Sequence, residues 1–183
     1  MGSKLIDLKI IRFPGARVIG KIMRVPEPCT IEDRTVNDLL DAMQRDGHYD
    51  FLFAQPDRLA PARDTVGWQG DYKPGQGWYT YLVGVLFKKG APVPAGYEYR
   101  DIAPCTMAVA QIQGLEGEEG GDGMATASEK LAQARDAQGY KYDSSHGMFE
   151  MEYFSEERFY FPANRGEQPI LDFYSPCKKR KFF

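Results

Sequence analysis

Two glutamates near the end of the chain stand in an otherwise apolar and aromatic run, MFEMEYF, at residues 148–154. Because Glu150 and Glu152 are two residues apart, a β-strand would point both carboxylates to the same face. If that face is solvent, they are the polar side of a half-buried strand. If it is interior, the carboxylates lie among rings, where they could attract a cation or, with a raised pKa, act as a base.

The hydrophobic pattern predicts the elements that must position this run. Alternating apolar residues predict strands, and one-sided apolar faces bounded by capping residues and glycine predict two helices. The predicted strands are 17–25, 49–53, 78–87, 96–100, 107–112, 148–154 and 170–174, and the predicted helices run from Thr30 to Gly47 and from Thr126 to Gly139. The order strand, helix, strand, strand occurs twice, which predicts an α+β fold.

A weak internal repeat accompanies this order. Residues 14–22 align with residues 104–112 at an offset of 90, with their hydrophobic positions in register. The pattern also matches 49–53 with 149–153 and sets Leu52 opposite Glu152. The chain is therefore predicted to contain two related halves. At the position of Glu152 only the later half has an acidic residue, because the earlier half has Leu52 there. This is expected for a single site in a pseudo-symmetric protein.

The segment 55–77 is rich in proline and glycine and predicts a long loop. Loops of this length inside a compact domain are uncommon and often act as lids or binding loops. Trp68 and Tyr72 lie in this segment. They are predicted to contact a ligand from the loop, and the alternative is that they pack on the edge of the core.

Composition excludes several classes of protein. The chain has 183 residues, 43% hydrophobic and 27% charged, which is typical of a globular domain. No run approaches the roughly 18 apolar residues of a membrane span, and the N-terminus lacks the pattern of a secretion signal, so the cytoplasm is the expected location. The net charge is −3 although four positive charges lie in 178–181, so the rest of the chain is acidic and no direct contact with nucleic acid is expected.

No metal site, cofactor site or disulfide is expected. Cys29, Cys105 and Cys177 are far apart and form no CxxC pair. His48 and His146 are isolated from each other, and each sits in a sequence typical of a turn. The glycines of 114–123 do not form a phosphate-binding motif, because the strand and helix that such a motif requires do not flank them.

Several short motifs resemble the GyrI-like small-molecule-binding domains. The clearest is GYEYRDIAPCTMAVAQIQG at 96–114, in which a glycine, a glutamate, a proline and a strand of small residues follow one another. Residues 81–85 resemble the strand before the family's hairpin, and residues 16–20 resemble its first strand. Each motif is weak alone, but their order covers the chain from about Leu8 to Cys177.

The resemblance implies a single domain at 1–177, similar to the effector-binding domains of multidrug-responsive transcription regulators, followed by a basic tail at 178–183. It implies an α+β fold of two βαββ halves, about 8–90 and 96–177, related by a pseudo-twofold axis. Their antiparallel sheets would form a central ligand cleft, with two main helices. No helix-turn-helix extension is present, so a stand-alone domain is implied, and a homodimer remains open.

The resemblance also implies a function, which is the binding of bulky, amphipathic aromatic or cationic small molecules next to a central glutamate. Some GyrI-like proteins are understood to open the cyclopropane ring of DNA-alkylating natural products with a glutamate as general base, so a hydrolase is the first alternative. A protein that modulates gyrase by direct interaction is the second. In the family a glutamate is followed by an aromatic residue, and Glu152 with Phe154 fits this pattern better than Glu150 does.

Other site residues follow from these functions. In the hydrolase alternative Tyr81 or Tyr153 would donate a hydrogen bond to the substrate, and Trp68 or Trp78 would form a stacking wall. The predicted catalytic residues are Glu152, Glu150 and Tyr153, and the predicted ligand-binding residues are Trp68, Tyr72, Trp78, Tyr81, Phe149 and Phe154.

Overall fold

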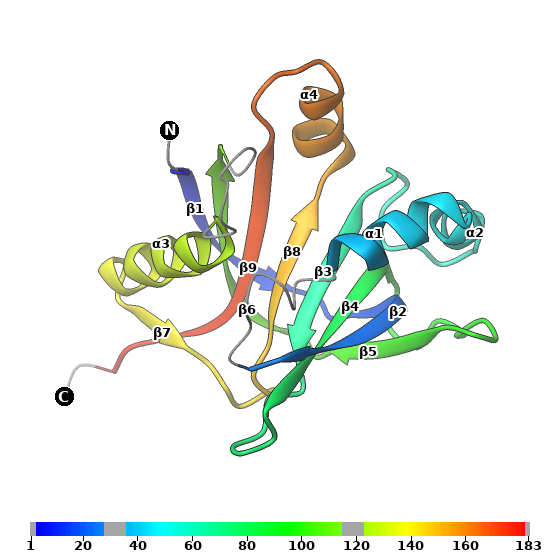
Figure 1. Cartoon of the computed structure of the whole chain (residues 1–183). Coiled ribbons are helices and arrows are strands. Elements are labelled where there is room, and N and C mark those ends of the chain that lie inside the picture. The colour runs from blue at the N-terminus through cyan, green and yellow to red at the C-terminus, as the bar shows by residue number, and fades with distance from the viewer. Residues whose placement is uncertain (1–2, 28–35, 115–122, 182–183) are drawn as a thin grey trace.

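A computed structural model describes residues 3–27, 36–114 and 123–181 (Figure 1). The elements in chain order are β1 (Lys4–Phe13), β2 (Ala16–Pro26), α1 (Val36–Arg45), α2 (His48–Phe53), β3 (Thr65–Gly70), β4 (Trp78–Phe87), β5 (Glu98–Ile102), β6 (Cys105–Gln113), α3 (Gly123–Ala137), β7 (Tyr140–Tyr142), β8 (Glu150–Phe154), the π-helical turn η1 (Glu156–Tyr160), α4 (Phe161–Asn164) and β9 (Ile170–Lys179). The expected α+β class is confirmed. No helix in this part of the chain is long and apolar enough to cross a membrane.

One antiparallel sheet contains the two halves of the molecule. Its strand order is β1-β6-β9-β8-β3-β4-β2-β5, and β7 adds to β9. The three strands β2, β4 and β3 of the first half correspond to β6, β9 and β8 of the second, and β3 pairs with β8 where the halves meet. The aligned segments 14–22 and 104–112 begin β2 and β6, so this part of the predicted repeat is confirmed.

The first strand of each half completes the sheet of the other half. β1 pairs with β6, and β5 pairs with β2. The corners that lead into β2 and β6 touch, because a Cβ at Gly15 would lie 3.0 Å from both the Ile102 carbonyl oxygen and a Pro104 side-chain carbon. Gly15 also has a φ of 85°, a conformation that glycine adopts most easily. The halves predicted at 8–90 and 96–177 are therefore interlocked at their edges.

The two faces of the sheet bury different side chains. On the helix face, α1 and α2 cover one cluster and α3 covers another, including Leu52 and Leu131 respectively. The opposite, helix-free face carries a cluster that extends from β1 at one edge of the sheet to β5 at the other and includes Trp68, Leu82 and Met151. Figure 1 shows α3 over the second half and α1 and α2 over the first. Since side chains alternate along a strand, every residue of β3 or β8 can be assigned to one face.

Two predicted elements are wrong. Residues 49–53 form helix α2 instead of a strand, with Tyr49 and Leu52 buried three residues apart on one helical face. Conversely, the predicted loop 55–77 contains β3, a fully buried strand in the middle of the sheet. The counterpart of β8 is therefore β3, and the predicted match of 49–53 with 149–153 is incorrect.

The ends of other elements also differ from prediction. α3 begins at Gly123, so Thr126 lies inside the helix instead of capping it. β9 continues through Lys179 and pairs with β7, so the first two residues of the predicted tail belong to the sheet. The predicted cap at Thr30 and most of the acidic, glycine-rich segment 116–123 lie outside the described residues.

Candidate functional site

Glu152 lies on the helix face at the join between the two halves. It pairs across the strands with Gly67 of β3 and Phe173 of β9, and only 5% of it is exposed. The Tyr81 hydroxyl, from β4, donates a hydrogen bond of 2.5 Å to Glu152 Oε2. A carboxylate and a phenol that are 71 residues apart are thus brought together inside the protein.

A glycine makes this contact possible. Gly67 lies on β3, between β4 and β8, and its missing side chain leaves the space through which Tyr81 reaches Glu152. A Cβ at Gly67 would collide with the Tyr81 hydroxyl and lie 2.9 Å from Glu152 Oε2. The small residue therefore positions the pair without contributing a functional group.

The charge of Glu152 is poorly compensated. Burial raises the pKa of Glu152 to about 7, and the hydrogen bond from Tyr81 opposes this rise only in part. Burial and the neighbouring Glu152 raise the pKa of Tyr81 well above its ordinary value, so Tyr81 remains a hydrogen-bond donor. Among the described residues no Lys, Arg or His forms an ion pair with Glu152. A buried carboxylate without a cationic partner can accept a proton or a cationic ligand.

Glu150 points to the same face, as the spacing of the two glutamates predicts. It is half-buried, and Ser128 of α3 donates a hydrogen bond of 3.1 Å to its Oε2. Burial raises the pKa of Glu150, and the hydrogen bond from Ser128 opposes this. The second carboxylate is therefore tied to the helix of the second half, whereas Glu152 is tied to a strand of the first.

Gln69 adds a buried amide to this surface. It pairs with Tyr81 of β4 on one side and with Glu150 of β8 on the other, so all three side chains lie on the helix face. Only 8% of Gln69 is exposed, and its Nε2 has no hydrogen-bond partner within the described residues. Burying an unpaired amide costs free energy, so this nitrogen is suited to donate to a bound molecule.

Aromatic rings lie at both ends of the surface that Glu150, Glu152 and Gln69 form. Tyr72 stacks on Tyr79 with ring centroids 5.2 Å apart. Burial raises the pKa of Tyr72, and the nearby Tyr79 and Glu150 add to this effect. At the other end Phe154, which follows Glu152 on the same face, packs edge-on against Phe159 at 4.9 Å.

The remaining predicted site residues lie on the helix-free face. Trp68 and Phe149 are buried there and stack with centroids 6.2 Å apart, so Trp68 is a core residue and not part of a lid. Trp78 is half-buried under Arg24. Tyr153 donates a hydrogen bond to Asp64 and lines a separate pocket of about 640 Å³. The structure does not bring these four aromatic residues together with Glu152.

Five residues of this surface were not predicted from the sequence, namely Gly67, Gln69, Ser128, Tyr79 and Phe159. The signal for the first two is the alternation of Val66 and Trp68 within the glycine-rich segment, which is the period of a strand. No pattern in the sequence indicates the contact of Ser128 with Glu150. The described residues contain no group of three His, Cys, Asp or Glu that could hold a metal ion.

Solved structures share the fold. No protein-family model and no curated protein sequence matches the chain. An integron cassette protein from Vibrio cholerae matches with a TM-score of 0.58 and 10% identity, covering 97% of this chain and 100% of that one. SAV2435 bound to tetraphenylphosphonium matches with a TM-score of 0.59 and 11% identity, covering 94% of each chain. The C-terminal domain of EcmrR matches with a TM-score of 0.57 and 12% identity, covering 94% and 98%. The expected GyrI-like fold is confirmed.

Proposed function

We propose that this chain, which has the GyrI-like fold, binds bulky aromatic cations on its helix face, with Glu152 as the counter-ion. The observation that carries the proposal is the burial of Glu152 without a cationic partner among the described residues. A delocalised organic cation enters such an environment more readily than a hydrated lysine, because less hydration is lost. The solved structure of SAV2435 with tetraphenylphosphonium, a ligand of this chemical kind, supports the proposal.

The neighbouring groups suggest which ligands bind best. The stacked pair Tyr72 and Tyr79 offers ring surface for aromatic contacts and cation–π attraction. Gln69 offers an amide donor two residues along β3 from the position opposite Glu152, which is about 7 Å at strand spacing. A preferred ligand is thus an aromatic cation with a carbonyl or ether oxygen about 7 Å from its positive charge.

Titration with two cations tests the proposal. Tetraphenylphosphonium has no hydrogen-bond acceptor, whereas rhodamine 6G carries an ester and an ether oxygen. Calorimetry should give saturable binding of both, and Glu152→Gln should weaken both at least about tenfold because the counter-charge is lost. Gln69→Leu should weaken rhodamine 6G alone. The control is Glu157→Gln, which removes an exposed carboxylate elsewhere and should change neither affinity.

Each result bears on a different part of the proposal. If neither cation binds the wild-type protein with saturation, cation binding on this face is rejected. If both bind and Glu152→Gln binds them equally well, another group is the counter-ion. Equal loss of both ligands in Gln69→Leu would assign this residue a structural role instead of recognition of an acceptor.

One observation favours a hydrolase as the second candidate. A pKa of about 7 suits a general base, because near neutral pH the carboxylate is both present and basic enough to activate water. Incubation with a cyclopropane-bearing indole, followed by mass spectrometry, tests this activity. Ring-opened product should form with the wild-type protein and decrease in Glu152→Gln. Equal product from both proteins would exclude Glu152 as the base.

A further inference from the structure

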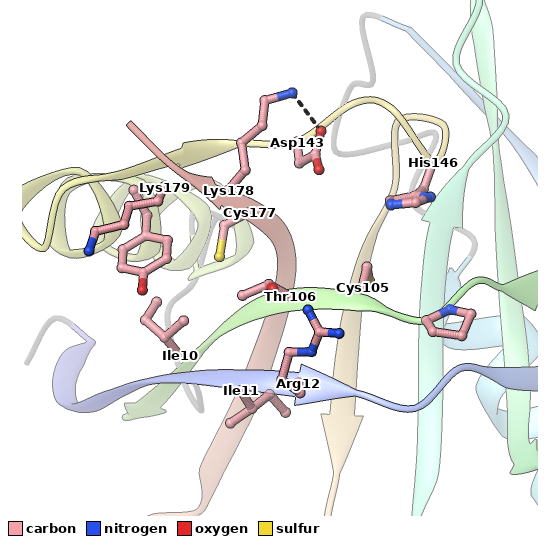
Figure 2. Close-up of a pocket in the computed structure, with 12 residues that line it drawn as sticks. Ile10, Ile11, Arg12, Cys105, Thr106, Asp143, His146, Cys177, Lys178 and Lys179 are labelled. Atoms are coloured by element: carbon pink, nitrogen blue, oxygen red, sulfur yellow. Dashed lines mark hydrogen bonds and ion pairs between the residues drawn. The ribbon is translucent and has the colours of Figure 1, made fainter. Parts of the chain in front are cut away.

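Besides the pocket lined by Tyr153, another pocket lies where β1, β6 and β9 meet the loop between β7 and β8, and Glu152 does not line it. Its volume is about 590 Å³. Figure 2 shows that its lining side chains come from all of these segments.

Two basic side chains reach into this pocket from opposite sides. Arg12 extends from β1, and His146 extends from the loop that follows β7 (Figure 2). Neither has a hydrogen bond or ion pair with another described residue. Arg12 differs in this from most arginines of the described chain, which pair with an aspartate, as Arg17 does with Asp101 and Arg100 with Asp71.

The acid on the lining is already neutralised. Asp143 forms an ion pair of 2.7 Å with Lys178 and also accepts a hydrogen bond from the Ser145 backbone. The hydrogen bond from Lys178 is the main reason that the pKa of Asp143 falls to about 2. Lys179 adds a further positive charge to the rim. The lining is therefore net positive in a protein whose net charge is −3. An anion is attracted to this pocket, although the net charge of the protein as a whole repels it.

The inner wall is apolar and chemically inert. Ile10, Ile11 and Pro104 form part of it, and such surface strengthens electrostatic attraction by excluding water. Burial raises the pKa of Cys105, and burial raises the pKa of Cys177 to about 11. Both thiols are thus protonated and unreactive near neutral pH. The pocket is built for binding and not for thiol chemistry.

We infer that this pocket binds an oxyanion, a carboxylate or a phosphate group, between Arg12 and His146. A guanidinium presents two parallel N–H donors that match two oxygens of such a group. Thr106 pairs with Arg12 across the strands and supplies a hydroxyl donor on the same side. The apolar wall would receive the body of the ligand that carries the oxyanion.

Titration of the whole protein with inorganic phosphate and with benzoate tests this inference. The side-chain NMR signals of Arg12 and His146 should shift with saturation. Arg12→Gln and His146→Ala should each weaken binding at least about fivefold. The matched control is Arg165→Gln, because Arg165 is also exposed and lies after α4, outside this pocket. It should bind like the wild type, and so should Glu152→Gln.

The two probes separate the sources of the oxyanion. Tighter binding of benzoate would indicate a carboxylate with an apolar body, and tighter binding of phosphate would indicate a phosphate group. Signals that never saturate with either probe would overturn the inference. Equal weakening in Arg12→Gln and Arg165→Gln would also overturn it, because it would show general attraction to positive charge and no defined site.

Discussion

At Glu152 the protein keeps an ionisable group where ionisation is unfavourable. An ordinary stabilising design would place an apolar residue, or a paired charge, at a position that is 5% exposed. Here the only described hydrogen-bond donor to the carboxylate is neutral, the Tyr81 hydroxyl. If Glu152 is the counter-ion, as proposed, binding of a cation recovers the free energy lost in burying this carboxylate, which links the stability of the protein to ligand binding.

The affinity for a cation should therefore depend on pH around the pKa of Glu152, which is about 7. Only the carboxylate form attracts the ligand, so affinity rises with pH and levels off above the pKa. Between pH 8 and pH 6 the dissociation constant of tetraphenylphosphonium should increase about tenfold, following the carboxylate fraction. Calorimetry in buffers of different ionisation enthalpy should also detect proton release at pH 6. An affinity that stays constant over this range would contradict the assignment of Glu152.

The same carboxylate should lower the stability of the folded protein at alkaline pH. The pKa of Glu152 is about 7 when folded and near its ordinary value of 4.5 when unfolded, so the penalty is absent below 4.5 and complete above 7. Glu152→Gln keeps the hydrogen bond from Tyr81 and removes the charge. It should increase the free energy of unfolding by roughly 2–4 kcal/mol at pH 8, and by much less at pH 4.5.

Denaturant titrations of the two proteins at both pH values measure this difference. Glu157→Gln is the control, because Glu157 is exposed and its loss should change stability little at either pH. A variant that is less stable than the wild type at pH 8 would show that the charged form of Glu152 is better compensated than the described contacts indicate.

At the scale of the elements, β3 shows why the sequence predicts only part of the site. The alternation in residues 148–154 predicts β8 and places both glutamates on one face, which is what the structure has. β3, in contrast, contains Gly67 and Gly70, and glycine is depleted in strands because it contributes no side chain to the sheet. Local propensity therefore predicts a loop, whereas burial between β4 and β8 makes this segment a strand.

The partner of Glu152 could not be predicted in the same way. Tyr81 is one of several tyrosines in strands, and its contact depends on the register between β4 and β3 and on the absence of a side chain at position 67. Register is set by tertiary pairing, which a local pattern does not encode. The prediction of a strand at 49–53 is wrong for a related reason, since the apolar residues of this segment fit both the period of a strand and that of a helix.

Gly67→Ala should disrupt the pair of Tyr81 and Glu152. The added methyl group meets the Tyr81 hydroxyl and must displace it, so the free energy of unfolding should fall by about 1–3 kcal/mol and cation affinity should change. In a Tyr81→Phe background the hydroxyl is absent, and the same substitution should cost less. A double-mutant cycle from denaturant titrations measures this coupling. Equal cost in both backgrounds would show that the methyl group is accommodated without moving Tyr81.

At the scale of the whole molecule, the exchange of edge strands joins the two halves. β1 protects the edge of β6 in the second half, and β5 protects the edge of β2 in the first. The cluster on the helix-free face includes Val18 and Met107 from different halves. The proposed cation site also needs both halves, since Tyr81 belongs to the first and Glu152 to the second. We therefore predict that the two halves fold as one unit and not as separate folding units.

Deletion of residues 1–13 tests this interlocking. It removes β1, which belongs to the first half by sequence but pairs with β6 of the second, so it uncovers the edge of β6 and the side chains that Ile11 and Phe13 pack against. The other strands of the first half, β2, β3 and β4, lose no strand partner. We expect both halves to lose stability together.

Trp68 and Trp78 lie in the first half, so their fluorescence reports on that half, whereas far-ultraviolet circular dichroism reports on the whole chain. In the intact protein both signals should change in one denaturant transition, and in the deletion variant both midpoints should decrease equally. If the fluorescence midpoint stayed at its intact value while the dichroism midpoint fell, the first half would be an independent folding unit, and the shared cluster would contribute little to joining the halves.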